Sequence, residues 1–260
     1  MPKNNFASEP TQRGQAPFER IAHRGASREA PENTIPAIRL AIQKYKVDRV
    51  EIDIRLTREG VPVVIHDATL ERTTNGKGKI RESSLAELKQ WDAGAKGVTI
   101  PTLEEVLREF PETPFCLEIK DKEIEAVKRV LEVIRPLARK GPLLIGSFYG
   151  KVARELRRLS PPSIEGILSE DEVAWGYLAF RLGLRKFSFP SRYAFLPQAR
   201  YGLRLDQPEW IDFLHRQGVW VFYWTVNEVG QMKNLLSKGV DGILSDYPDR
   251  LQSMTSKVIS

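Results

Sequence analysis

Short β-rich runs alternate with helical stretches along most of the chain, and this alternation is what most limits the folds open to it. The β-rich runs lie at residues 20–23, 49–57, 114–120, 143–148, 164–168, 186–189, 219–226 and 242–245. Apolar residues at helical spacing separate them, most clearly Ile35, Ile38 and Ile42, then Ile124, Val127, Leu131 and Ile134, and later Val229, Met232 and Leu236. Eight such units, each on the order of 30 residues long, are typical of a (β/α)8 barrel, the TIM-barrel class of α/β fold. A doubly wound open sheet is the alternative.

One segment interrupts this alternation after the second β-rich run. Residues 61–91 contain a further strand ending at His66, a glycine-rich stretch, and a short helix that would open with a capping box of Ser84 and Glu87. We interpret residues 67–101 as an elaborated loop over one end of the barrel, because the segment is too short for a hydrophobic core of its own.

Length and composition suit a single domain at residues 18–260. A chain of 260 residues that is 41% hydrophobic can bury one large core, and no stretch approaches the roughly 18 apolar residues of a membrane span. Residues 1–17 are polar, lack the apolar region of a secretory signal and are expected to form a flexible tail. Cys116 is the only cysteine, so no disulfide can form within the chain, and the cytoplasm is the expected compartment.

The net charge of +6 favours partners that carry phosphate. The 40 lysines and arginines are dispersed rather than gathered in one tract, and neither a zinc-finger spacing nor an RNA-binding aromatic signature accompanies them. We therefore expect no nucleic-acid partner, because a phosphate-bearing small molecule explains the charge more simply.

Carboxylates alternate with apolar residues in two of the β-rich runs. Glu51 and Asp53 share one face of their strand, and Cys116, Glu118 and Lys120 share one face of the next. In a barrel the apolar face packs against the helices and the other face points into the lumen, where buried carboxylates are costly without a cation. The pattern therefore indicates a metal site, and an ordinary half-exposed strand is the alternative.

Two of the three histidines lie beside these acidic residues in the sequence. His23 ends the first β-rich run, and His66 ends the strand that follows Glu51 and Asp53. Imidazoles move protons near neutral pH, so the set suggests metal-assisted acid/base chemistry on an anionic substrate. His215 lies in a helical pattern and is expected to be structural or exposed.

Several motifs, in the same order along the chain, resemble the signatures of the glycerophosphodiester phosphodiesterase family. They cover residues 20–250 and comprise His23-Arg24-Gly25, Pro31-Glu32-Asn33-Thr34, Glu51-Ile52-Asp53, His66-Asp67 with Leu70, Arg72-Thr73-Thr74 and Gly78, Leu117-Glu118-Ile119-Lys120, Trp224-Thr225-Val226-Asn227, and Gly242-Ile243-Leu244-Ser245-Asp246 with Pro248. Each motif alone is weak, but the ordered set is specific. One departure is visible: Ser245 stands where the family usually has threonine, and we expect no loss of chemistry from it.

The resemblance implies a (β/α)8 barrel with a segment inserted after the second strand, and hydrolysis of glycerophosphodiesters to sn-glycerol 3-phosphate and an alcohol. It implies a divalent cation, Ca²⁺ or Mg²⁺, held by Glu51, Asp53 and Glu118, with His23 and His66 as the acid/base pair. Which histidine is the acid, and whether water or the glycerol 2-hydroxyl attacks phosphorus, stays open.

Other residues have both a functional and a structural interpretation. Arg24 and Lys120 are placed to bind phosphate oxygens, but could instead form ion pairs with Glu32 and Glu118. Glu32 is expected either in the metal shell or at the N-terminus of the following helix.

Two residues near the end of the chain are candidates for supporting the site. Asn227 precedes a helix and is interpreted as its N-cap rather than as a ligand, although it could support the site from behind. Trp224 shares a strand face with Trp220 and Phe222, so it could form a substrate wall or simply pack in the core.

Residues 175–201 are rich in aromatic and arginine residues. Packing is the simpler explanation, but a mouth that accepts an acyl chain or makes transient contact with a membrane surface is the alternative. That alternative leads to a lysophospholipase D or sphingomyelinase D-like activity on the same barrel. A third hypothesis is a catalytically silent phosphate-binding module. The head group and the oligomeric state are left open by the sequence.

Overall fold

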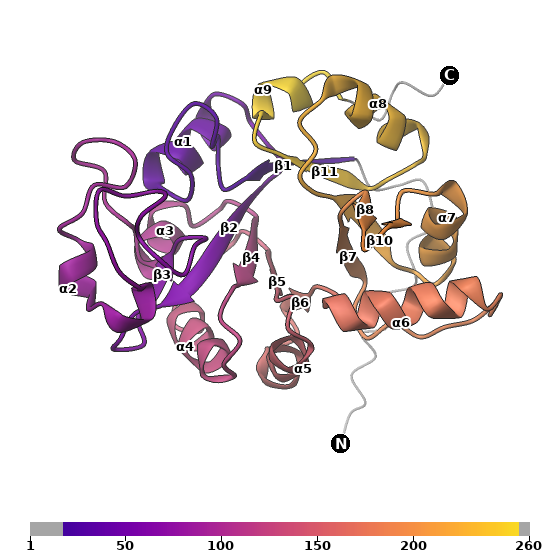
Figure 1. The fold of residues 1–260 in the computed structure, drawn as a ribbon, viewed down its shortest axis with the longest axis horizontal. Coiled ribbons are helices and arrows are strands. Elements are labelled where there is room, and N and C mark those ends of the chain that lie inside the picture. Colours follow the sequence, from indigo (N-terminus) through magenta and orange to yellow (C-terminus); the bar gives the residue numbers. More distant parts are fainter. Residues whose placement is uncertain (1–17, 255–260) are drawn as a thin grey trace.

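Eight parallel strands form a nearly closed barrel in the computed structural model, which describes residues 18–254 (Figure 1). The strands are β1 (Glu19–His23), β2 (Arg49–Leu56), β4 (Phe115–Ile119), β5 (Leu143–Gly146), β6 (Ile164–Gly166), β7 (Tyr193–Leu196), β10 (Trp220–Tyr223) and β11 (Gly242–Ser245). Their order around the barrel is β6-β5-β4-β2-β1-β11-β10-β7. A single parallel bridge between Ile167 and Tyr193 joins the two ends of this path. The predicted TIM-barrel class is confirmed, and the open-sheet alternative is wrong.

Helices surround the barrel because each presents an apolar face to the outside of the strands (Figure 1). They are α1 (Ile35–Gln43), α3 (Leu103–Glu109), α4 (Glu125–Ile134), α5 (Gly150–Leu159), α6 (Glu170–Arg181), α7 (Pro208–Arg216), α8 (Val229–Ser237) and α9 (Pro248–Leu251). Ile52 and Leu117 pack outward against Ile38 and Val127 in one buried cluster. The alternate residues of the same strands therefore face the lumen.

The sixth barrel strand is not where the sequence pattern placed it. We expected it at residues 186–189, but the structure has β7 at Tyr193–Leu196. Phe187 and Phe189 instead contact each other edge-on, with ring centroids 4.8 Å apart, and pack against the cluster under α6 and α7. Aromatic residues suit strands and helix-facing loops equally well, so their density alone misplaced the strand.

The inserted segment begins with β3 (Pro62–Val64), which pairs antiparallel with β2, and continues through the 3-10 turn η1 (Ile80–Glu82) and α2 (Leu85–Leu88). The expected capping box of Ser84 and Glu87 is present. The strand ends at Val64, two residues before the predicted end. The segment also has a small apolar cluster of its own, contrary to our expectation, with Val63, Ile65, Leu70, Ile80, Leu88, Ala93 and Ile100 buried in it.

A two-stranded hairpin of β8 (Ala199–Arg200) and β9 (Leu203–Arg204) follows β7. Parallel barrel strands carry their loops to functional sites at their carboxyl ends, so this hairpin lies at the same end as the other βα-loops. Within residues 18–254 no helix is both long and apolar enough to cross a membrane. The tail predicted for residues 1–17 lies outside the described residues.

Candidate active site

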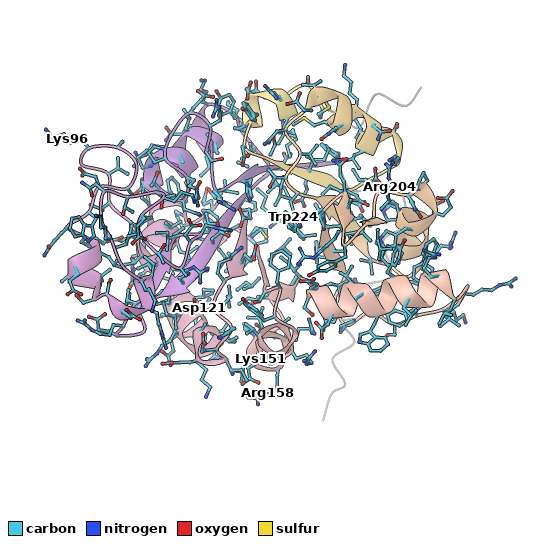
Figure 2. The ribbon with its side chains drawn as sticks, in the orientation of Figure 1. Lys96, Asp121, Lys151, Arg158, Arg204 and Trp224 are labelled. Carbon is cyan, nitrogen blue, oxygen red and sulfur yellow. The ribbon has the colours of Figure 1, made fainter. Side chains whose placement is uncertain are left out.

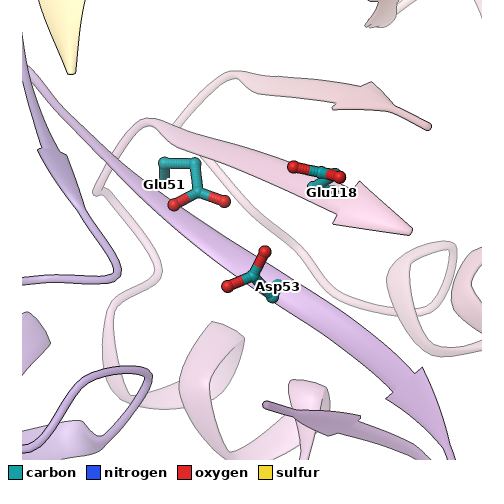
Figure 3. Close-up of side chains that lie close together, drawn as sticks. All are labelled: Glu51, Asp53 and Glu118. Carbon is teal, nitrogen blue, oxygen red and sulfur yellow. The ribbon is translucent and has the colours of Figure 1, made fainter. Parts of the chain in front are cut away.

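Glu51, Asp53 and Glu118 meet inside the barrel, as the alternation of β2 and β4 predicts (Figure 3). The register pairs Asp53 with Glu118 and Glu51 with Cys116. One carboxylate oxygen from each of the three acids lies within 4.8 Å of the others. Glu51 and Asp53 are almost completely buried, whereas 23% of the Glu118 side chain is exposed. Because β2 and β4 are neighbouring strands, acidic residues of two segments that lie far apart in the sequence bring their negative charges to one point.

Burial and mutual repulsion raise the free energy of this cluster when all three carboxylates are ionised. Burial, reinforced by Asp53 and Glu118, raises the pKa of Glu51 well above its usual range. Burial also raises the pKa of Glu118 to about 7, against the opposing charge of Lys120. Burial acts in the same direction on Asp53, but Arg24 and Lys120 outweigh it and lower the pKa of that carboxyl.

One oxygen of this cluster has no hydrogen-bond partner. Glu51 Oε1 is buried without a donor, which is uncommon for a carboxylate oxygen. Carboxylate oxygens at this spacing are ligands that a hard divalent cation such as Ca²⁺ or Mg²⁺ prefers, and Glu51 Oε1 has no donor that a cation would have to displace. The residues present therefore fit a divalent cation.

His23 lies at the end of β1 and is held by the residue that follows β11. Its Nδ1 is 2.6 Å from Asp246 Oδ1, and its Nε2 is 3.9 Å from Glu51 Oε2. Asp246 in turn accepts hydrogen bonds from Asn227 Nδ2 at 2.8 Å and from Ser27 Oγ at 3.3 Å. An ionised carboxylate only accepts, so Nδ1 carries the proton and Nε2 is left to exchange one.

His66 is held in the same way, by the residue that follows it. Its Nδ1 is 2.6 Å from Asp67 Oδ1, and Arg72 donates from Nε to Asp67 Oδ2 at 2.6 Å. Burial is the largest effect on the His66 imidazole and lowers its pKa, despite the nearby Asp53 and Asp67. The neutral ring, with Nε2 able to accept a proton, is therefore favoured at neutral pH.

Arg24 and Lys120 form ion pairs with the acidic cluster. Lys120 Nζ lies 2.8 Å from Glu118 Oε1 and 3.5 Å from Asp53 Oδ1. Arg24 Nε lies 3.1 Å from Asp53 Oδ2, although its N–H is not aimed to make a hydrogen bond there. Both cations therefore lie beside the three carboxylates, where an anionic phosphate would also be attracted.

Glu32 does not cap α1, and its place in the metal shell stays a prediction. Thr34 caps α1, so Glu32 is not the cap, and it is absent from the cluster of three acids. It instead accepts from Arg24 Nη1 at 2.9 Å and from Arg72 Nη1 and Nη2 at 2.9 and 2.8 Å. The positive charge on both sides explains this position. Glu32 thereby links Arg24 to Arg72.

Asn227 is not the N-cap that its place before α8 suggests. Glu228 occupies the cap position of α8, and its side chain makes no capping hydrogen bond. Asn227 Oδ1 accepts from Ser245 Oγ and from the Asp246 backbone N–H, both at 3.0 Å, while Nδ2 donates to Asp246. Ser245, which stands where the family usually has threonine, therefore uses its hydroxyl to bind Asn227.

A cavity of about 250 Å³ opens above these residues. Its lining includes polar and charged groups, among them His23, Arg24, Glu51, His66, Glu118 and Lys120, and apolar groups, among them Phe148, Ile167, Leu168, Phe195, Trp224 and Leu244. Trp224 packs on the lumen cluster of Ile21, Phe222 and Leu244 and also lines this cavity, so both interpretations of it apply. It lies near the middle of the molecule in Figure 2.

The remaining candidates lie away from the cavity or divide between two places. His215 Nε2 is 2.9 Å from Asp241 Oδ2, which also accepts from the Val221 backbone, so this histidine joins α7 to the strands, as expected of a structural residue. Within residues 175–201, Tyr177 and Phe180 are packed under the helices while Trp175 and Tyr201 are largely exposed. A membrane contact through this segment stays a prediction.

Three supporting residues were missed at the sequence level. Asp246 and Asp67 hold the histidines. The Asn33 side chain donates from Nδ2 to Asp53 Oδ2 at 2.8 Å, and its Oδ1 accepts from the Asp53 backbone N–H at 3.1 Å. Each belongs to a quoted motif, and for Asp246 and Asp67 the position after a strand was the available signal. The partner of each could not be assigned without the fold.

Known proteins of similar sequence and structure share this arrangement of the chain. Residues 23–250 match the model of the Glycerophosphoryl diester phosphodiesterase family. A glycerophosphodiester phosphodiesterase of Caldanaerobacter subterraneus subsp. tengcongensis is 32% identical over 255 residues, covering 91% of this chain and 97% of the relative. A mouse protein named lysophospholipase D GDPD3 is 28% identical, covering 93% of this chain and 83% of the relative.

A solved structure with the same fold contains a bound product. It is an Oleispira antarctica phosphodiesterase in complex with sn-glycerol-3-phosphate, with a TM-score of 0.77 and 32% identity. The match covers 90% of this chain and 95% of that one.

Proposed function

This chain belongs to the glycerophosphoryl diester phosphodiesterase family and has that family's activity, and we propose that it uses a divalent cation and two histidines to release sn-glycerol 3-phosphate and an alcohol. One observation carries the proposal: the cluster of Glu51, Asp53 and Glu118 lies in the same cavity as His23 and His66.

The cation would be held by Glu51, Asp53 and Glu118, with Ca²⁺ and Mg²⁺ as the candidates. When bound, it would neutralise negative charge on the phosphodiester oxygens. Arg24 and Lys120 then bind the remaining phosphate oxygens, because both are charged and lie beside the cluster.

The two histidines divide the proton transfers. One Nε2 accepts the proton of the attacking hydroxyl as its oxygen bonds to phosphorus, and the other donates a proton to the alcohol oxygen as its bond to phosphorus breaks. Asp246 and Asp67 keep each Nδ1 protonated and each ring oriented. The attacking group is water or the glycerol 2-hydroxyl, and in the second case a cyclic phosphate forms first.

The test is an assay of the purified protein on glycerophosphoglycerol, glycerophosphoethanolamine, glycerophosphocholine and lysophosphatidylcholine, with the products identified by phosphorus NMR. We expect sn-glycerol 3-phosphate from the three deacylated diesters, loss of activity on chelation, and recovery with Mg²⁺ or Ca²⁺. A fully active protein after verified metal removal would contradict the role of the cation. Release of phosphocholine rather than choline would contradict the bond that we propose to break.

A lysophospholipase D activity is the second candidate, because a similar mouse protein carries that name and several apolar side chains line the cavity. Faster turnover of lysophosphatidylcholine than of glycerophosphocholine would favour it. A silent phosphate-binding module is set aside, because the chain is a member of an enzyme family and retains the acids and histidines of its motifs.

A further inference from the structure

A cluster of charged and aromatic side chains lies at the mouth of the barrel, outside the group of residues assigned to the reaction. Arg200, in the β8–β9 hairpin, donates from Nε to Glu170 Oε1 at 2.9 Å and from Nη2 to Glu170 Oε2 at 2.7 Å. The Tyr201 hydroxyl donates to Glu170 Oε1 at 2.9 Å. Glu170 begins α6, directly after the loop that follows β6. Both oxygens of this carboxylate are therefore occupied by groups of the protein.

Phe148 connects this rim cluster, defined as Glu170, Arg200 and Tyr201, to the catalytic cavity. Its ring lines the cavity and contacts Trp224 edge-on, with centroids 5.4 Å apart. The Arg200 guanidinium carbon lies 5.8 Å from the centre of this ring, and Lys120 Nζ lies 5.5 Å from it. The aromatic surface nearest the mouth therefore already contacts two cations of the protein.

The alcohol of the substrate must reach this rim. Phosphate and glycerol are common to all glycerophosphodiesters and can be enclosed in the cavity of about 250 Å³ above the carboxylates. The head group differs between substrates, and βα-loops at the carboxyl ends of the strands are where a barrel enzyme meets the variable part of its ligand. Phe148, Arg200 and Tyr201 belong to such loops, and Phe148 contacts both Lys120 and Arg200.

The charges at the rim disfavour a cationic head group. A quaternary ammonium is bound by open aromatic faces or by an available carboxylate. Here Phe148 already contacts Lys120 and Arg200, and Glu170 is bound by Arg200 and Tyr201. Hydroxyl groups, in contrast, can hydrogen-bond to tyrosine and guanidinium donors.

We propose that Arg200, Glu170 and Tyr201 form a head-group subsite that selects neutral polyhydroxy alcohols, such as glycerol, over quaternary ammonium alcohols, such as choline. The proposal rests on the proposed function and specifies its substrate class. Arg200 determines the selectivity, because it both repels a cation and occupies Glu170.

The experiment compares kcat/KM for glycerophosphoglycerol and glycerophosphocholine in the native protein and in Arg200→Gln. We expect the native protein to prefer glycerophosphoglycerol by about tenfold, and Arg200→Gln to shift the ratio towards glycerophosphocholine by about tenfold, because Glu170 becomes available to the ammonium group. Arg200→Gln combined with Glu170→Gln should reverse that shift, since the released carboxylate is removed. A purely structural role for Arg200 would lower both rates without changing their ratio.

Arg204→Gln is the matched control. Arg204 lies in the same hairpin but pairs with Asp206, which keeps Lys238 as a partner at 2.9 Å. This variant should keep the native ratio. A native preference for choline, or an Arg200→Gln ratio equal to the native one, would overturn the subsite while leaving the phosphodiesterase reaction standing. Absence of sn-glycerol 3-phosphate from every diester would instead overturn both.

Discussion

Each of the two histidines proposed to be catalytic is held by an acid that is itself held by another side chain. Asp246 is bound by Asn227, and Asp67 is bound by Arg72. This second contact keeps the acid ionised and in place, because charge-assisted hydrogen bonds are shorter and stronger than neutral ones. The His23 and His66 rings are therefore presented to the cavity with the same tautomer.

Replacing either histidine should remove proton transfer without removing the metal site. We expect His23→Ala and His66→Ala to lower kcat by at least about 10²-fold with the bound metal retained. His215→Ala is the control, because this residue binds Asp241 far from the cavity and its loss should leave kcat nearly unchanged. Steady-state kinetics with metal analysis will check this. A full-rate His23 or His66 variant, or an equally damaged His215 variant, would refute the acid/base assignment.

Glu118 should couple metal binding to pH. Its pKa of about 7 in the metal-free protein lies above the usual carboxyl value, so the folded chain holds this proton more tightly than the unfolded chain does. This tighter proton binding stabilises the folded chain. The stabilisation is complete below the ordinary pKa of about 4.5 and is lost as the pH rises through 7. A cation needs the ionised form, so its affinity should rise over the same interval.

Calorimetric titration with Mg²⁺ or Ca²⁺ at pH 6 and pH 8 measures this coupling. We expect tighter binding at pH 8 and more protons released per bound ion at pH 6. Glu118→Gln keeps the shape but cannot ionise, so it should weaken binding and reduce the difference between the two pH values. Equal affinity at both pH values in the native protein would contradict the coupling.

At the scale of elements, the inserted segment contributes to the site through Arg72. This arginine bridges Asp67 and Glu32, and through them it supports both His66 and Arg24. The small apolar cluster of the inserted segment and the pairing of β3 with β2 hold this segment in place and so position the arginine. The insertion therefore helps to hold His66 and Arg24 in place.

Arg72→Ala should lower kcat by about tenfold or more while leaving the fold intact, because Asp67 and Glu32 lose a shared cation. The pH dependence of kcat should also move, since Asp67 orients His66 less firmly. Lys79→Ala is the control within the same segment, because the Lys79 ammonium pairs with the exposed Glu82. Equal activity of the two variants would show that the bridge is dispensable.

For the whole molecule, the barrel is weakest where its two ends meet. β2 and β4 pair through five residues each, whereas β6 and β7 are joined by one bridge and by the hydrogen bond from Leu168 N to Tyr193 O at 2.9 Å. A crevice of about 500 Å³, lined by Glu165 and Ser191 among others, separates the two strands at their other end. This seam lies beside the proposed head-group subsite.

Native-state hydrogen exchange will locate the weak seam. We expect backbone amides of β6 and β7, Leu168 included, to exchange at least about tenfold faster than those of β2 and β4, because fewer hydrogen bonds must break for them to open. Added product or a competing diester should slow exchange at the seam if the rim closes on it. Uniform protection around all eight strands would contradict a local weakness.

Local periodicity was sufficient for much of the fold and for the centre of the site. Alternation with a period of two residues places Glu51, Asp53 and Glu118 on inner faces wherever β2 and β4 lie in the barrel, and the Ser84 capping box needs only its own neighbours. Such features depend on residues a few positions apart, so they can be inferred before the fold is known.

The tertiary structure alone decided which distant residues meet. Asp246 reaches His23 across 223 residues because closure of the ring places β11 beside β1. Glu32 was expected in the metal shell or at the N-terminus of the following helix, and Asn227 was expected to be an N-cap. The structure binds both to charges delivered by other elements. The sixth barrel strand, β7, was misplaced for the same reason, since an aromatic run fits inside the barrel or under a helix. Local propensity determines the direction in which a side chain points, whereas the packing of distant elements determines what it meets there.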